Sequence, residues 1–285
     1  MRRHGSGGAS GLLIAVAVAV LVPGAADGQS WRTVTMSRQA EGDRPLDVQV
    51  KYGAGRFTIR PADDGLLYRM HLRYDEDVFE PVAEYDGHLL RLGVDNLGRS
   101  LNLGRNRSGG ELELMLGRDV PMDLTMEFGA VRADLDLGGL ELTDLRLSTG
   151  ASESTVDVSE PNPGAIRTAR FEVGAADFTA RHLGNLNAER IEIDAGVGEI
   201  TLWFTGDWAR DAAVSIDMGL GALDLRFPEG LGVRLRKDSF LTSLDSEGLV
   251  KRGDYYYSLD WERAERKVTI DLDAAFGSVR VHWVR

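Results

Sequence analysis

The sequence contains no cysteine, and that absence removes several classes of protein. A disulfide framework, a thiolate zinc site, a cysteine nucleophile and a cysteine-linked lipid anchor each need a thiol. Basic residues are outnumbered, with 33 Lys and Arg against 45 Asp and Glu. The net charge of -12 excludes a sequence-independent nucleic-acid binder, which needs a basic face. With 43% hydrophobic and 27% charged residues, the chain is neither a disordered tail nor a multi-span membrane protein.

Motifs of common enzyme sites are also missing. The five histidines form no HxxxH or HExxH pair, so we expect His71, His88, His182 and His282 to be ordinary strand residues. There is no G-x-S-x-G nucleophile elbow and no Walker-type phosphate loop. Two Gly-x-Gly sequences lack the third glycine and the helix of a dinucleotide fingerprint. The sequence therefore predicts a protein that is not an enzyme, with no catalytic residue, no cofactor and no metal ligand.

The first 28 residues have the layout of a secretory signal peptide. Two arginines precede an uncharged run at 12–22, which is too short to cross a bilayer as a helix. Small residues follow, and we expect cleavage near Ala26 or Gly28; an uncleaved membrane anchor is the alternative. Cleavage would remove two arginines and one aspartate and leave a net charge of -13. No later apolar run is long enough to span a membrane, so we predict an exported protein, periplasmic or extracellular, with no transmembrane segment in the mature chain.

Glycine is in excess, at 34 of 285 residues or about 12%, against roughly 7% in average proteins. Its spacing is regular. Two alternating apolar residues are followed by a short gap, a glycine, any residue, a small residue, and two further alternating apolar residues. Copies of this pattern, some of them degenerate, occupy 48–59, 124–131, 145–158, 171–178, 191–202, 214–225 and 270–281.

These repeats predict a solenoid of β-strands. Alternation at period two marks half-buried strands, and glycine between two such runs supplies a corner with positive φ or lets backbones pass closely. The first glycines of the central copies are separated by 21, 24, 22 and 23 residues. We therefore predict an all-β fold, a single-stranded β-solenoid with rungs of roughly 22 residues. An antiparallel β-sandwich is the alternative, since its turns recur every 8–12 residues.

The flanks of the repeat break the period. Strand-like runs at 66–74, 78–84 and 88–94 precede the central copies, and further runs at 254–261 and 267–272 follow them. Atypical ends are expected where a solenoid must cover unpaired backbone groups. We predict a signal peptide at 1–28, an N-terminal β cap with the first strands at 29–125, and a solenoid with a C-terminal hairpin cap at 126–285.

The chain resembles the bacterial toast-rack domains of the adhesin-like and LiaF-like envelope families. The resemblance covers most of residues 45–285 and is most specific at the end, where 248–253 and three tyrosines precede the final repeat at 268–281. It implies a non-catalytic, envelope-associated β protein. LiaF itself carries N-terminal membrane helices, and Ala275 stands where the family prefers glycine. The role of LiaF in restraining a stress sensor is therefore not carried over.

Four acidic residues stand two places before the first glycine of a repeat, or before Ala275. They are Glu172, Asp194, Asp217 and Asp273. In stacked rungs their carboxylates would form a ladder about 4.8 Å apart, repelling by roughly 3 kcal/mol per pair at a dielectric near 20 and below about 1 kcal/mol in water. The ladder must face solvent, which we favour, or be bridged by a cation such as calcium, which we keep as a hypothesis.

Two other features suggest surface contacts. Arg99, Arg105 and Arg107 lie in a glycine-rich stretch read as a solvated loop, which could instead engage anionic glycan or lipid headgroups. The aromatic residues at 255–257 and Trp261 could stack on sugars, although alternation would bury part of them in a cap.

We predict an exported envelope interaction or structural module, adhesin-like or related to stress response. Its partner would be an envelope protein or a glycan. The alternatives are a carbohydrate-active enzyme on a β-helix and a membrane-tethered regulator of an envelope stress sensor.

Overall fold

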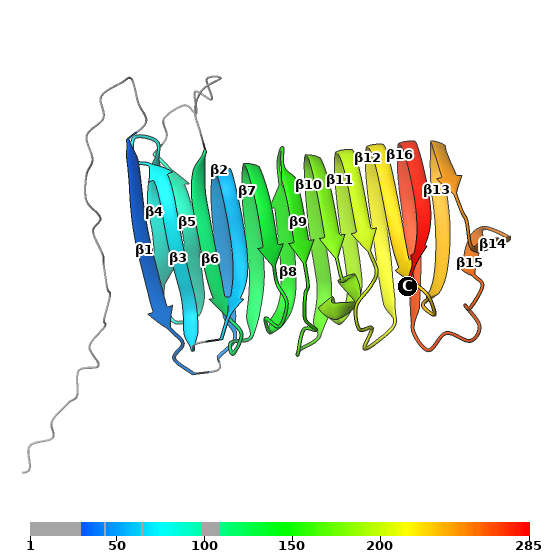
Figure 1. Cartoon of the computed structure of the whole chain (residues 1–285), viewed down its shortest axis with the longest axis horizontal. Coiled ribbons are helices and arrows are strands. Elements are labelled where there is room, and N and C mark those ends of the chain that lie inside the picture. The colour runs from blue at the N-terminus through cyan, green and yellow to red at the C-terminus, as the bar shows by residue number, and fades with distance from the viewer. Residues whose placement is uncertain (1–29, 43, 64, 98–108) are drawn as a thin grey trace, which may run out of the picture.

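The computed structural model describes residues 30–42, 44–63, 65–97 and 109–285 (Figure 1). The expected signal peptide and the basic loop with Arg99, Arg105 and Arg107 lie outside these residues. The described chain is built almost entirely of strands, joined in one 16-stranded sheet. In chain order they are β1 (Trp31–Gln39), β2 (Leu46–Ala62), β3 (Leu66–Asp75), β4 (Phe79–Tyr85), β5 (Leu89–Asn96), β6 (Gly110–Gly117), β7 (Met122–Asp136), β8 (Leu142–Thr149), β9 (Glu153–Asp157), β10 (Ile166–Arg181), β11 (Ala188–Trp203), β12 (Ala212–Pro228), β13 (Gly232–Asp245), β14 (Leu249–Arg252), β15 (Tyr255–Ser258) and β16 (Lys267–Val284).

The long strands stack side by side in parallel and form the body of the molecule (Figure 1). Their order is β2, β7, β8 with β9, β10, β11, β12, β16 and β13. β8 and β9 are two halves of one rung, because both pair in parallel with β7 and with β10. The all-β class and the stacked, solenoid-like arrangement are confirmed, and the parallel pairing excludes the antiparallel sandwich.

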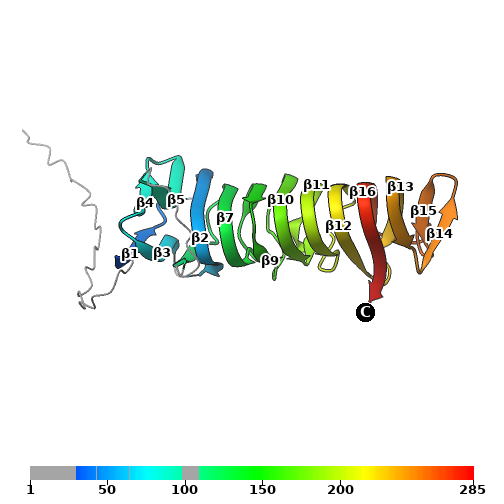
Figure 2. The same ribbon diagram turned by 90° about the horizontal axis from the view of Figure 1, so that it is seen from above.

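Each rung bends in the middle, so that both of its halves turn the same side inward. In β11 the alternating buried positions next to the bend are Ile191, Ile193 and Ala195 before it, and Ile200 and Leu202 after it. The alternation therefore changes phase at the bend, where the repeated glycines lie. Figure 2 shows the curved strands from above.

Buried side chains at equivalent positions stack along the solenoid and form one continuous core. A single register position holds, from β2 to β13, Val48, Leu124, Leu145, Ala169, Ile191, Val214, Ile270 and Leu235. All eight are at most 2% exposed. Burying an aliphatic side chain contributes about 1.5–3 kcal/mol, so this inward face supplies the main stabilisation of the fold.

The two glycines of a repeat have different roles at the bend. Gly219, a first glycine, has an ordinary φ, but a Cβ there would lie 2.5 Å from the carbonyl oxygen of Gly196 in the next rung. Gly221, a second glycine, has φ +147°, and a Cβ would collide with the carbonyl oxygen of Gly198. Positive φ thus belongs to the second glycine, so Ala275, at a first position, avoids this backbone strain.

Antiparallel strands cover both ends of the stack. At the N-terminal end, β1, β3 and β6 form an antiparallel group, and β6 pairs with one half of β2. The β4–β5 hairpin covers the other half through β5. At the C-terminal end, β15 pairs antiparallel with the first half of β13 and with β14. These segments account for the irregular flanks of the sequence.

The last strand of the chain is not the last rung. β16 pairs in parallel with both β12 and β13, so it inserts between two strands that are consecutive in sequence (Figure 1). The 56-residue interval between the repeats of β12 and β16 is therefore a detour through β13 and the C-terminal hairpin. In space, the glycine-marked repeat continues from β12 to β16 without interruption.

Helical structure is limited to one 3-10 turn, η1 (Leu183–Leu186), in the part of the chain that the structure describes. None of the described residues forms a helix with the length and apolar character required to cross a membrane.

Candidate interaction surface

The four acidic residues expected to form a ladder do lie side by side. Glu172 pairs in register with Asp194, Asp194 with Asp217, and Asp217 with Asp273. The row continues onto β13, because Asp273 pairs with Asp238. All five side chains are exposed. We call these five carboxylates the acidic row.

Two arginines lie near the acidic row. Besides the hydrogen bond to Glu192, the charges of Asp194 and Glu172 help to raise the pKa of Arg170. Besides the hydrogen bond to Asp271, the charge of Asp238 helps to raise the pKa of Arg236. Among the described residues, no member forms an ion pair. The row two positions earlier on the same rungs behaves differently, since Arg170 pairs with Glu192 and Arg236 pairs with Asp271 at 2.7 Å. Within the described part of the chain, the carboxylates nearest the bend therefore lack a direct ion pair, whereas Glu192 and Asp271, farther from it, have one.

Asp217, in the middle of the row, shows the electrostatic consequence. Partial burial raises its pKa above the ordinary value of 3.8, and the charges of Asp194 and Asp273 on the adjacent rungs raise it further. Neighbouring carboxylates repel each other, and proton binding relieves that repulsion. A cation or a basic group placed over the row would relieve it in the same way.

A second row lies at the bend itself and consists of large apolar side chains. Val197, Leu220 and Phe276 pair in register on β11, β12 and β16. They are 51%, 51% and 48% exposed. We call them the apolar row. On each rung they stand three residues after a member of the acidic row, and together the two rows form what we call the corner surface.

The same position carries alanine on the rungs that precede β11, whereas on β13 it is Leu241, which pairs in register with Phe276. Ala175 pairs with Val197, and Ala130 pairs with Ala54. The unchanged register of β8 and β9 against β7 and β10 places Ala151 between Ala130 and Ala175. Four successive rungs therefore form the bend with alanine at this position. The fold does not require a large apolar side chain there, and on three rungs it nevertheless exposes one.

The calcium hypothesis gains no support from the geometry. Across the described residues there is no group of three or more acidic or histidine side chains that could hold one metal ion. The carboxylates of the acidic row follow each other along a line instead of converging on a point. Calcium takes 6–8 oxygen ligands around one centre, which a line of this kind does not offer.

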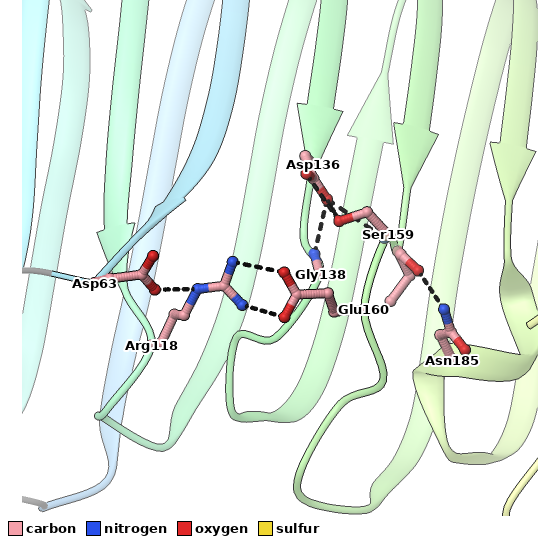
Figure 3. Close-up of polar contacts among 8 residues, drawn as sticks. Asp63, Arg118, Asp136, Gly138, Ser159, Glu160 and Asn185 are labelled. Atoms are coloured by element: carbon pink, nitrogen blue, oxygen red, sulfur yellow. Dashed lines mark hydrogen bonds and ion pairs between the residues drawn. The ribbon is translucent and has the colours of Figure 1, made fainter. Parts of the chain in front are cut away.

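The opposite side of the rungs, where loops connect them, is held by polar contacts (Figure 3). Arg118 contacts Asp63 at 2.6 Å and donates two hydrogen bonds to Glu160, at 2.8 and 3.0 Å. The buried Asn185 donates to the Val158 carbonyl at 2.7 Å. These contacts link loops that are 20 to 60 residues apart in sequence, so they brace the stack instead of forming a reactive site.

Asp136 and Ser159 form a second contact pair on this side (Figure 3). The Ser159 hydroxyl donates to Asp136 at 2.7 Å, and the same carboxylate accepts the backbone N–H of Gly138 at 2.9 Å. Asp136 thus caps a loop, and its hydrogen bonds within this part of the chain are structural.

The histidines take ordinary positions in or beside strands. His71 contacts Thr35 at 2.9 Å, and His182 contacts Asp157 at 2.6 Å. His282 lies 3.9 Å from Asp224, and His88 is exposed in a turn. Among the described contacts, no imidazole bonds to a serine hydroxyl in the manner of a nucleophile and its base.

The aromatic cluster of the C-terminal hairpin packs largely against itself. The Tyr257 ring lies 6.2 Å from Tyr255 and 5.6 Å from Trp261. Arg234 lies over Tyr255 and Trp261, while Tyr256 packs against the core. Cap packing therefore accounts for these four side chains.

Sequence reasoning missed three features of the surface and the loops. Asp238 has no glycine motif after it, so only the register of β13 against β16 adds it to the row. The sequence shows three apolar residues between two glycines, or between Ala275 and Gly277: Val197, Leu220 and Phe276. Their exposure could not be predicted without knowing where the alternation changes phase at the bend. The buried Asn185 carries no local signal, because its partners come from other loops.

Comparison with known proteins places this geometry in a family. No curated protein matches the chain. Its overall likeness to solved structures is remote. A protein from Clostridium sporogenes ATCC 15579, proposed to act in cell adhesion, is 16% identical with a TM-score of 0.48, covering 90% of this chain and 100% of that one. A protein from Bacteroides fragilis NCTC 9343, proposed to be an adhesin, is 12% identical with a TM-score of 0.31, covering 89% and 97%.

The family model gives the assignment. The model of the N-terminal domain of toast_rack, DUF2154, matches residues 26–179 and 169–226, which is more than half of the chain. The chain therefore belongs to the toast-rack family.

Proposed function

We propose that the protein is an exported, non-catalytic module that binds another component of the bacterial envelope through its corner surface. The observation that carries the proposal is the apolar row: three large apolar side chains about half exposed, beside carboxylates that form no ion pair among the described residues. Large apolar residues exposed side by side are typical of interaction sites in soluble proteins.

The rigid stack supports this role. Each rung is hydrogen-bonded to both neighbours, so side chains at one register position keep a fixed spacing along the solenoid. A partner that contacts the corner surface meets a surface that is already organised, and little ordering entropy is lost on binding. An adhesin-like or stress-response role in the envelope is consistent with membership of the toast-rack family.

A capture experiment tests the proposal. We would immobilise the purified wild-type protein and, separately, a variant with three substitutions, Val197→Ala, Leu220→Ala and Phe276→Ala. Both are exposed to an envelope extract of the bacterium that naturally contains the protein. We expect the wild-type protein to retain a defined component that the variant loses by at least about tenfold, since several apolar contacts are removed together.

The matched control changes three other exposed apolar side chains, Leu97→Ala, Val250→Ala and Leu259→Ala, which are 45%, 43% and 73% exposed. It should retain the component as the wild-type protein does. Equal retention by all three proteins, or no retained component, would contradict the proposal. Turnover of envelope polysaccharides by the purified protein would contradict its non-catalytic part.

A further inference from the structure

We propose that the corner surface binds a basic amphipathic helix of a partner protein, with its apolar face on the apolar row and its Lys or Arg residues over the acidic row. This inference rests on the proposed function and specifies the partner's chemistry.

The charge of the acidic row selects a basic partner. Five carboxylates follow one another on adjacent rungs, and none forms an ion pair among the described residues. At the strand spacing of about 4.8 Å, each neighbouring pair repels by roughly 1 kcal/mol in water, and more once a partner excludes water. A purely apolar partner would exclude water from the carboxylates and strengthen their repulsion, whereas lysine and arginine side chains would neutralise it.

The spacing of the rows selects a helix. Three apolar side chains on adjacent rungs span two intervals, about 10 Å. Neighbouring positions on one helix face are about 5–6 Å apart, so three of them span about 10–12 Å. Alternate residues of a strand are about 6.6–6.8 Å apart and would be out of register by the third side chain. The acidic row spans about 19 Å, a length covered by three to four helical turns.

The same charges disfavour two other occupants. A second copy of this chain would bring one acidic row toward another if the corner surfaces met face to face. An anionic bilayer would present phosphate groups to the same carboxylates. Both arrangements add repulsion where the basic helix removes it.

The test uses a fluorescent synthetic peptide of about 18 residues, with leucines on one helical face and lysines flanking them. Binding to the purified protein is followed by fluorescence anisotropy at two salt concentrations. We expect saturable binding that weakens about tenfold in Val197→Ala, Leu220→Ala, Phe276→Ala. In Asp194→Asn, Asp217→Asn, Asp273→Asn, we expect weaker binding and a smaller salt dependence.

Two controls separate this site from general attraction of a cationic peptide to an acidic protein. The variant Asp95→Asn, Asp119→Asn, Asp207→Asn removes three exposed carboxylates elsewhere and should bind the peptide as the wild-type protein does. A peptide with the same composition in scrambled order, without an apolar face, should bind at least about tenfold more weakly.

Equal weakening by the two aspartate variants, or equal binding of the scrambled peptide, would overturn the inference. Two other results would also overturn it if the designed peptide fails to bind. One is binding of the protein to anionic vesicles, and the other is dimer formation in sedimentation, in each case abolished in the apolar-row variant. If the peptide fails but the capture experiment still depends on the apolar row, the inference is wrong and the proposed function stands.

Discussion

Two groups of rungs can be compared: the C-terminal rungs, β11, β12 and β16, and the middle rungs, β7, β8 with β9, and β10. Their buried faces are alike, but their exposed side chains at the bend differ. Inside, both groups stack buried apolar side chains at the same register positions. Outside, the middle rungs have alanine at the bend, whereas the C-terminal rungs expose Val197, Leu220 and Phe276 beside carboxylates that make no ion pair with any described residue. The inward face is fixed by folding, and the outward face is where these rungs diverge.

The two groups also differ in how the bend and the loops are held. The C-terminal rungs bend at second glycines with φ from +145° to +149°, while the equivalent positions of the middle rungs are Val131, Ser152 and Ala176, without positive φ. Middle loops are linked by polar contacts such as those of Asn185. At the ends of the C-terminal rungs, aromatic rings pack instead: the ring centroids of Phe204 and Phe227 are 4.9 Å apart, and those of Phe227 and Trp283 are 5.6 Å apart.

The largest expected effect comes from placing a middle-type bend in a C-terminal rung. Gly221→Ala should lower the free energy of unfolding by about 3 kcal/mol or more, because it adds left-handed strain and a collision with the Gly198 carbonyl. Gly230 has φ +88° but open space around its Cβ position, so Gly230→Ala isolates the strain and should cost about 1 kcal/mol. Equal losses in urea denaturation would contradict the steric explanation.

Removing a loop contact of the middle rungs should cost less. Asn185→Ala leaves the Val158 carbonyl and the Asp207 N–H without their partner, and we expect a loss of about 2 kcal/mol in thermal or urea unfolding. Ser159→Ala, on the exposed contact with Asp136, should cost less than about 1 kcal/mol. If Asn185→Ala were neutral, the polar bracing of these loops would be unimportant for stability.

Neutralising a carboxylate should change stability in opposite directions in the acidic row and in an ion pair of the middle rungs. Because the pKa of Asp217 is raised in the folded protein, the native state binds its proton more tightly than the unfolded chain does. Its ionisation therefore lowers stability above the folded pKa, and this penalty disappears as the pH falls below about 3.8.

Asp217→Asn should accordingly raise stability at pH 7 by roughly 0.5 kcal/mol after solvent screening, and have no effect below pH 3.8. On a middle rung, Glu153→Gln removes the pairing with Arg132 at 2.6 Å and should be neutral or slightly destabilising. Urea unfolding across pH measures both. Destabilisation by Asp217→Asn at pH 7 would show that the row is compensated in the folded protein.

The smallest effect on stability is expected when the apolar row is replaced by alanine, the residue at this position on the middle rungs. Each of Val197→Ala, Leu220→Ala and Phe276→Ala should change the free energy of unfolding by less than about 0.5 kcal/mol, because alanine already occupies this position on four rungs. A core control, Ile193→Ala, should cost about 2–5 kcal/mol. A comparable cost at Leu220 would make the apolar row a structural feature.

Local sequence patterns were sufficient to predict the rungs. The features that they did not predict depend on pairing between residues far apart in the sequence. Alternation and glycine spacing identify the bends at Gly198 and Gly221, because both features arise within a few residues. The in-register acidic row followed from the same period. The insertion of β16 between β12 and β13 has no local signal, since it depends on which strand edge is free when the last strand pairs. Asp238 and the contacts of Asn185 were missed for the same reason.

The most direct test of the account places a photo-crosslinking amino acid at Leu220 and, in a matched protein, at the exposed Ala151 of a middle rung. Both proteins are produced in the bacterium and irradiated, and adducts are read by gel shift and mass spectrometry. The account predicts a defined adduct with an envelope protein from position 220 and none from position 151. Equal adducts at both positions, or none from 220, would contradict the claim that the C-terminal corner is a binding surface.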